Sequence, residues 1–144
     1  MNFLQSPQRR WLDLSVGIVL MSMLAFGSSW IYHLNEDARQ YTLDSELAMR
    51  GQAVSTNEGC VACHTVDGSP GVGPSWKNMW GRESQLSNGS TVRVDEAYFR
   101  ESIQNPPLKV VQGYPNIMLH YFLSDEEIDA LIAFAQSLSE TAPD

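Results

Sequence analysis

Residues 59 to 65 read GCVACHT, and this stretch contains both cysteines of the chain and one of its three histidines. Two thiols this close could form a disulfide, act as a redox-active dithiol, supply half of a zinc site or attach a haem. The spacing disfavours a structural disulfide, and a thioredoxin-like dithiol would accompany a βαβ pattern that the sequence lacks. Zinc needs four ligands, and the sequence has no second cysteine pair and no His-x-His cluster.

A histidine directly after the second cysteine is the attachment signature of c-type haem. The thiols of Cys60 and Cys63 would form thioethers with the two vinyl groups of one haem c, and His64 would lie under the ring as an iron ligand. We therefore expect the rest of the domain to supply walls for one covalently attached haem.

Three segments have the periodicity of helices that could form such walls. Residues 44–54 place apolar or small side chains on one face, and residues 95–104 follow a capping Asp95 and must stop before the proline pair at 106 and 107. Residues 124–138 begin with a capping box, Ser124 with Glu127, and carry an apolar stripe. No β alternation of useful length is found, so the predicted fold class is all-α, with three main helices around a covalent haem.

The N-terminal part is uncharged from Leu14 to Tyr32. At about 1.5 Å per residue this run gives roughly 28 Å of helix, enough to cross a hydrocarbon core. A cleaved secretory signal is the alternative, because Arg9 and Arg10 form a basic start and residues 25–27 have the small-x-small pattern of a cleavage site. The apolar run is longer than a usual signal core and continues past that site, so we interpret residues 1–33 as a single transmembrane anchor.

The positive-inside tendency places the arginine pair, and hence the N-terminus, in the cytoplasm. The haem domain, residues 44–144, would then lie in the periplasm, attached to the bacterial inner membrane through a linker of residues 34–43. If extended, the stretch between Tyr32 and Asp44 could reach no more than roughly 36 Å, which would keep the haem close to the bilayer.

The chain carries a formal net charge of −8. Binding to nucleic acid depends on neutralising phosphates with Lys and Arg, so nucleic acid is not expected as a partner.

The order helix, Cys-x-x-Cys-His, loop, helix, loop with methionine, terminal helix resembles class I cytochrome c over residues 44–138. The phrases GCVACHTVDGSPGVGPSWKNMWGR, DEAYFRESIQNP and LSDEEIDALIAFAQSL are similar to the cytochrome c domain fused to subunit II of some haem–copper oxidases and to the monohaem cytochrome subunit of alternative complex III. No cysteine pair of a copper domain precedes Asp44, so we expect the cytochrome unit alone on one anchor. The small subunit of bacterial nitric oxide reductase has the same overall layout.

The resemblance also implies further site residues. Met118 in GYPNIMLHYF matches the methionine that supplies the second iron ligand, although Leu119 follows it where the family commonly has proline, and His120 remains a competitor. The family pattern implies that the carbonyl of Pro74 orients His64 and that Trp76 packs against the haem. It also implies that Arg82 lies near a haem propionate.

The resemblance thus implies an electron-transfer protein of a respiratory or similar chain and not an enzyme in its own right. Its expected partner is a membrane redox complex, either alternative complex III or a haem–copper oxidase. A haem enzyme or sensor with a displaceable sixth ligand is the alternative, but a peroxidase should carry distal acid–base groups, and the sequence shows none.

Overall fold

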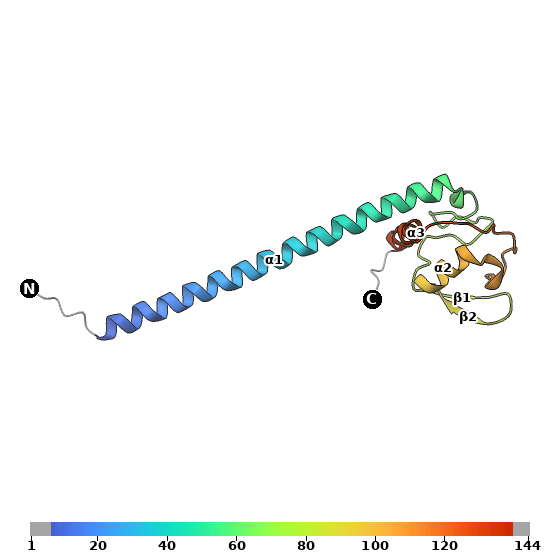
Figure 1. Cartoon of the computed structure of the whole chain (residues 1–144). Helices are drawn as coiled ribbons and strands as arrows, with labels where there is room; N and C mark the ends of the chain where they lie inside the picture. The colour runs from blue at the N-terminus through green and yellow to red at the C-terminus, as the bar shows by residue number, and fades with distance from the viewer. Residues whose placement is uncertain (1–6, 140–144) are drawn as a thin grey trace, which may run out of the picture. The chain divides into compact units, whose positions relative to one another are not determined.

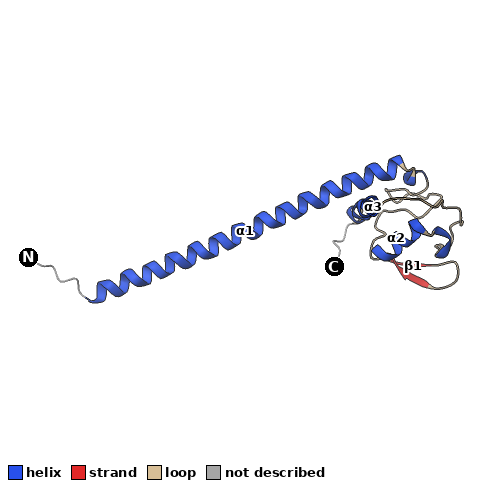
Figure 2. Ribbon diagram, viewed as in Figure 1, coloured by secondary structure: helices blue, strands red, loops and turns tan. Residues whose placement is uncertain are grey.

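The computed structural model describes residues 7–139, without the side chains of residues 7–16, 24 and 25. Residues 1–6 of the predicted anchor and residues 140–144 of the predicted haem domain lie outside the described residues. The side chains of Arg9 and Arg10, which were used to predict the orientation, are not described either. The chain divides into two compact units, residues 1–42 and 43–144. The described residues are mostly helical (Figures 1 and 2).

The first helix, α1, runs without interruption over Pro7–Asn57. Its segment from Gly17 onward contains a stretch long and apolar enough to cross a membrane, and none of that stretch is buried in the structure. The stretch is a candidate membrane span by its length and composition, and a signal sequence near the N-terminus would also be this long and apolar.

Residues 34–43, the predicted linker, are part of α1. The reason is local, because the stretch contains no glycine or proline and includes good helix formers such as Ala38, Arg39 and Gln40. As a helix these ten residues span about 15 Å. This length lies within the upper limit calculated above for an extended chain.

The two other helices match their sequence signals. Helix α2 covers Glu96–Gln104, and the Asp95 side chain accepts a hydrogen bond from the backbone N–H of Tyr98 at 2.8 Å. Helix α3 covers Asp125–Ser137 and begins with the predicted capping box, in which Ser124 and Glu127 exchange hydrogen bonds. A short 3₁₀ turn, η2 (Pro106–Leu108), follows α2.

A small antiparallel hairpin is the one departure from the all-α expectation within the described residues. Strands β1 (Glu83–Gln85) and β2 (Thr91–Arg93) pair with Ser84 opposite Val92. Asn88-Gly89 lies in the connecting loop, and Gly89 has φ 86°, a left-handed conformation that favours glycine. Asn-Gly between strands is a strong hairpin signal, so the sequence contained the evidence that was missed.

The core of the second unit forms where α2 and α3 pack over the loop that contains Trp76. Fully or almost fully buried side chains of α3, Ile128 and Leu131 among them, fill its centre. The last turns of α1 pass very close to α3 at Gly51. A Cβ at this position would overlap the carbonyl of Ala130 and lie 2.8 Å from Cβ of Phe134, so only glycine allows this helix crossing.

Candidate functional site

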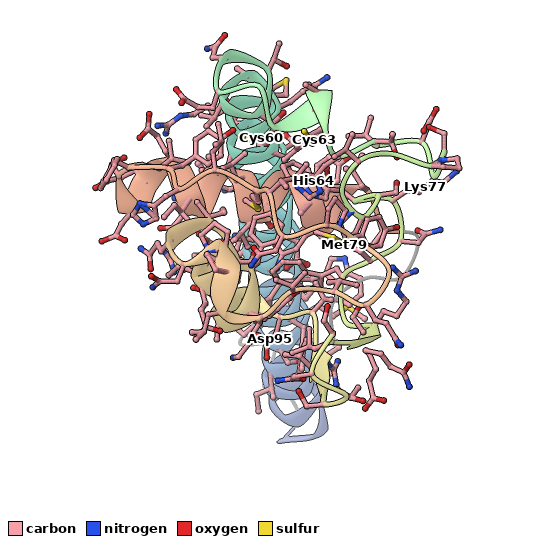
Figure 3. All side chains as sticks on the ribbon, turned by 90° about the vertical axis from the view of Figure 1, so that its right-hand side faces the viewer. Cys60, Cys63, His64, Lys77, Met79 and Asp95 are labelled. Atoms are coloured by element: carbon pink, nitrogen blue, oxygen red, sulfur yellow. The ribbon has the colours of Figure 1, made fainter. Side chains whose placement is uncertain are left out.

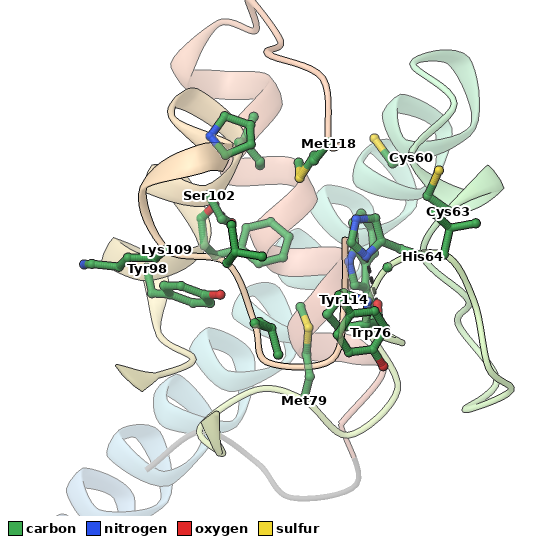
Figure 4. Close-up of a pocket in the computed structure, with 18 of the residues that line it drawn as sticks. Cys60, Cys63, His64, Trp76, Met79, Tyr98, Ser102, Lys109, Tyr114 and Met118 are labelled. Atoms are coloured by element: carbon green, nitrogen blue, oxygen red, sulfur yellow. Dashed lines mark hydrogen bonds between the residues drawn. The ribbon is translucent and has the colours of Figure 1, made fainter. Parts of the chain in front are cut away.

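One cavity of the second unit contains most of the predicted site residues (Figure 4). The volume of this cavity is about 220 Å³. All seven predicted site residues line it: Cys60, Cys63, His64, Pro74, Trp76, Arg82 and Met118. The fold therefore gathers residues from three separate segments around one space.

The two cysteines lie on a tight turn that begins where α1 ends. Gly59, with φ 75°, redirects the chain into a 3₁₀ turn, η1 (Cys60–Ala62). The carbonyl of Cys60 then accepts hydrogen bonds from the backbone N–H groups of Cys63 at 3.1 Å and His64 at 2.9 Å. This turn brings both thiols and the imidazole near one another (Figure 3), and all three line the same cavity.

The thiols are free, and Cys60 is partly buried whereas Cys63 is exposed. Burial, aided by the negative charge of Glu58, raises the pKa of the Cys60 thiol. The surroundings of Cys60 therefore favour a protonated thiol and differ from the electropositive surroundings of a low-pKa redox cysteine.

The imidazole of His64 is held in one orientation and one tautomer. Nδ1 lies 2.8 Å from the carbonyl oxygen of Pro74, and because a carbonyl can only accept, Nδ1 must be the protonated donor. Burial lowers the pKa of His64, which favours the neutral ring. The lone pair then resides on Nε2, the arrangement typical of a metal-ligating histidine with a carbonyl partner.

The loop behind His64 fits the imidazole closely. A Cβ on Gly73 would lie 2.5 Å from Cε1 of His64, and one on Gly71 would lie 2.6 Å from the carbonyl oxygen of Cys63. Trp76 stacks on His64 with ring centroids 5.5 Å apart and contacts Phe99 and Phe134 edge-on. The imidazole is thus fixed by backbone and aromatic contacts that leave little room for another rotamer.

Met118 comes from the loop between η2 and α3, and it points into the cavity (Figure 4). It is 36% exposed. His120, the competitor considered from sequence, does not line the cavity and packs edge-to-face against Phe122 with centroids 4.7 Å apart. The cavity therefore contains the thioether of Met118 and not the imidazole of His120.

The cavity is also lined by a second cation beside the predicted Arg82. Its charged lining residues are two cations, Arg82 and Lys109, with no Asp or Glu among the described lining residues. Lys109 is also paired with Glu101, Nζ to Oε2, at 2.5 Å. Met79 and Tyr98 are buried in the core and also line the cavity. Sequence spacing gives no signal for these roles, because they depend on how three loops converge.

These residues match the chemistry of haem c. Two thiols could take vinyl groups, an oriented imidazole and a thioether could bind iron, apolar walls could cover the ring, and cations could face the propionates. The polypeptide itself holds His64 in place, through Pro74, Gly73 and Trp76. The residues that could bind haem c therefore line one cavity whose shape suits the group.

Two comparisons bear on the family. A family model described as Cytochrome c matches residues 48–139, which is more than half of the chain. A curated relative, cytochrome c oxidase subunit 2 of Alkalihalophilus pseudofirmus, is 28% identical over 114 residues, which cover 76% of this chain and 30% of the relative. The chain thus spans about a third of the length of that relative. The chain belongs to the cytochrome c family: it is a class I c-type cytochrome, an electron carrier of a kind that holds haem c covalently.

Proposed function

We propose that this chain is a membrane-anchored monohaem cytochrome c that passes single electrons to or from a membrane redox complex. The observation that carries the proposal is the cavity in which two cysteines, an oriented histidine, a methionine and two cations converge. When bound, haem c supplies the one-electron chemistry of its iron.

The residues of the chain have separate tasks in this proposal. Cys60 and Cys63 attach the group through thioether bonds, His64 provides Nε2 as one iron ligand, and the sulfur of Met118 provides the other. Pro74 fixes the tautomer of His64 through the 2.8 Å hydrogen bond, and Trp76 covers the apolar ring. Arg82 neutralises propionate charge. A thioether ligand favours ferrous iron and raises the potential, which suits transfer toward an oxidase.

The N-terminal segment, residues 1–33, is the proposed anchor, residues 34–43 the helical connection, and residues 44–144 the haem domain. The proposed location is the bacterial inner membrane with a single pass, the N-terminus cytoplasmic and the haem domain periplasmic. The apolar stretch within α1 supports one membrane span, and the likeness to an oxidase subunit 2 supports a membrane redox complex as the partner. The proposed complex is a haem–copper oxidase or alternative complex III.

Covalent attachment can be tested on denaturing gels of the full-length protein. We expect the peroxidase stain for haem to follow the band of the wild-type chain and to be lost in the Cys60→Ser, Cys63→Ser double variant. A Val61→Ala variant, which changes the same turn without removing a thiol, is the matched control and should keep the stain. Haem that acid–acetone extracts from the wild type would contradict the proposal.

The anchor can be tested separately. Residues 1–34 are replaced by a cleavable export signal, and the product should be a soluble haem protein with an unchanged visible spectrum. A product that still pelleted with membranes would show that the apolar segment is not its only attachment.

A further inference from the structure

Arg100 joins helices α2 and α3 through its charge. Its guanidinium pairs with Glu96, one turn earlier on α2, at 3.2 Å, and with Asp125 at 3.3 Å. It also pairs with Asp129. Asp125 and Asp129 lie in the first two turns of α3. The side chain of Arg100 is 25% exposed, whereas each carboxylate is more than half exposed. One partly buried cation thus contacts three carboxylates, and two of these contacts cross from one helix to the other.

The C-terminal part of the chain supplies no cation of its own. Residues 110–144 contain no Lys or Arg. The start of α3 is crowded with acidic residues, namely Asp125, Glu126, Glu127 and Asp129, and like charges this close repel one another. Within residues 7–139, both ion pairs that α3 forms go to Arg100. Arg100 therefore supplies the positive charge that offsets the repulsion at this end of α3.

This end of α3 also receives the loop that carries Met118. The loop ends at Leu123, directly before the N-cap Ser124, and Leu123 lines the cavity as Met118 does. The capping box joins Ser124 to Glu127, so it stabilises the junction without attaching it to another element. The buried side chains of α3 begin only at Ile128. The pairs with Arg100 are therefore the polar contacts that fix this junction to a neighbouring helix.

Helix α2, to which Arg100 belongs, forms a wall of the cavity. Four of its side chains line the cavity, namely Tyr98, Phe99, Ser102 and Ile103 (Figure 4). Arg100 does not line the cavity, and its contacts lead to α3 instead. One side chain thus joins a helix that lines the cavity to the junction at which the loop of Met118 ends.

The loop itself has few other restraints. From Met118 to Leu123, no backbone hydrogen bond reaches another part of residues 7–139. Tyr121 and Leu123 pack against the core while remaining partly exposed. The position of the loop therefore depends strongly on its two ends. A displacement of the first turns of α3 away from α2 would move the loop, and with it the sulfur of Met118.

We propose that Arg100 is a positioning residue for Met118. Through Asp125 and Asp129 it holds the first turns of α3 against α2, which keeps the loop at the cavity with the thioether directed inward. The inference rests on the proposed function, in which Met118 is an iron ligand. It adds a residue outside the cavity that sets how often the thioether leaves the iron.

The test compares two carboxylates that share Arg100 but join different elements. Asp129→Asn removes a pair between helices, whereas Glu96→Gln, the matched control, removes a pair within α2. Full-length ferrous protein in detergent is mixed with carbon monoxide, whose binding rate reports the fraction of molecules in which Met118 has left the iron. Asp129→Asn should raise this rate about threefold to fivefold, and Glu96→Gln should leave it within about 1.5-fold of wild type.

Two further variants separate the pairing from net charge. Arg100→Gln should raise the rate at least as much as Asp129→Asn, and Arg100→Lys should lie between Arg100→Gln and wild type, because lysine keeps the charge without the two-pronged geometry. Arg93→Gln removes the same charge from an exposed position on β2 and should have no effect. These results would tie the carbon monoxide rate to the contacts of Arg100 with α3.

Salt provides a test without mutation. Because the carboxylates are exposed, screening weakens their pairs with Arg100. The wild-type rate should rise about twofold to threefold between about 20 and about 500 mM salt, and the Arg100→Gln rate should change less. Equal rates in Asp129→Asn and Glu96→Gln, or a wild-type rate that ignores salt, would overturn the proposal. A wild type that bound carbon monoxide as fast as Met118→Ala would instead count against the methionine ligand of the proposed function.

Hydrogen exchange, followed by mass spectrometry, tests the same contact without relying on the iron. The N–H of Ile128 donates to the carbonyl of Ser124 at 3.1 Å, and the N–H of Glu127 donates to Oγ of Ser124 at 3.3 Å. Both amides should exchange faster in Asp129→Asn, whereas amides near the buried Leu131 should keep the wild-type rate. Exchange that rose equally along all of α3 would indicate a general loss of stability and would contradict a positioning role for Arg100.

Discussion

Two segments line the cavity from different parts of the chain, and they are held in different ways. The cysteine segment, residues 60–76, is tied by backbone hydrogen bonds from Gly73 to Cys63 and from Trp76 to Thr65, at 2.9 and 2.8 Å. The methionine segment, residues 110–123, is tied near its start, where Gln112 donates to Gln85 at 2.9 Å. From Met118 to Leu123, no backbone hydrogen bond to another part of residues 7–139 is present.

The difference teaches where the site obtains its order. The cysteine segment is organised by its own backbone, its glycines and the buried ring of Trp76. The methionine segment has exposed side chains from residue 115 to residue 120, so contacts within the polypeptide constrain it less. Local stability should follow the same division, because few buried contacts and few hydrogen bonds allow local opening.

The largest expected difference in the free energy of unfolding is between two variants, each of which replaces one aromatic residue of one segment by alanine. Trp76→Ala removes a ring that is 6% exposed and contacts His64, Phe99 and Phe134, and should lower the free energy of unfolding by about 3–5 kcal/mol. Phe122→Ala removes an exposed ring and should change it by no more than about 0.5 kcal/mol. Guanidinium unfolding of the full-length protein in detergent, followed in the visible band, measures both. Equal losses would refute the division between the segments.

A medium effect is expected from adding a methyl group behind the imidazole. Gly73→Ala would place Cβ 2.5 Å from Cε1 of His64, and overpacking of this kind costs about 1–3 kcal/mol. Gly27→Ala adds the same methyl group where no atom lies within 4 Å and serves as the control. The same unfolding measurement should show a loss for Gly73→Ala and none for Gly27→Ala. A stable Gly73→Ala variant with normal haem content would mean that the cysteine segment can adjust.

The smallest effect on the fold is expected at the methionine itself, where the change should appear in the spectrum. Met118→Ala should leave a folded domain with attached haem, because the segment contributes little packing, but its ferrous form should bind carbon monoxide. His120→Ala should behave like wild type, since His120 does not line the cavity. Visible spectra with and without carbon monoxide decide the matter, and the opposite pattern would assign the ligand to His120.

The elements that sequence predicted well are those with local signals at both ends. Helix α2 has its cap at Asp95 and a proline pair beyond its end, and α3 has a capping box, so their bounds follow from neighbouring residues. The motif of Cys60, Cys63 and His64 is equally local. The hydrogen bond from His64 to Pro74 could be expected only through the family resemblance, because it joins residues ten positions apart across a loop.

What the sequence analysis missed depended on competition between signals or on loops that meet in space. For the linker the sequence analysis gave only an upper limit on its length, yet its composition favours a helix, and α1 continues through it. The hairpin was overlooked because its strands are three residues long, although Asn88-Gly89 marked the turn. Of the two cations that line the cavity, Arg82 was expected through the family resemblance, whereas Lys109 comes from a different segment that carries no local signal for this role.

The close crossing at Gly51 has a consequence for the order in which the domain can form. This contact joins the helix that precedes the cysteines to the last helix, so it links Gly51 to Ala130 and Phe134 across about eighty residues of chain. Contacts of such long separation form late, because the intervening loop must close before they contribute. During synthesis, α3 is the last wall to be made. The thiols of Cys60 and Cys63 should therefore be reachable on an open chain until the final helix is complete, which leaves an interval for the attachment of haem before the domain closes.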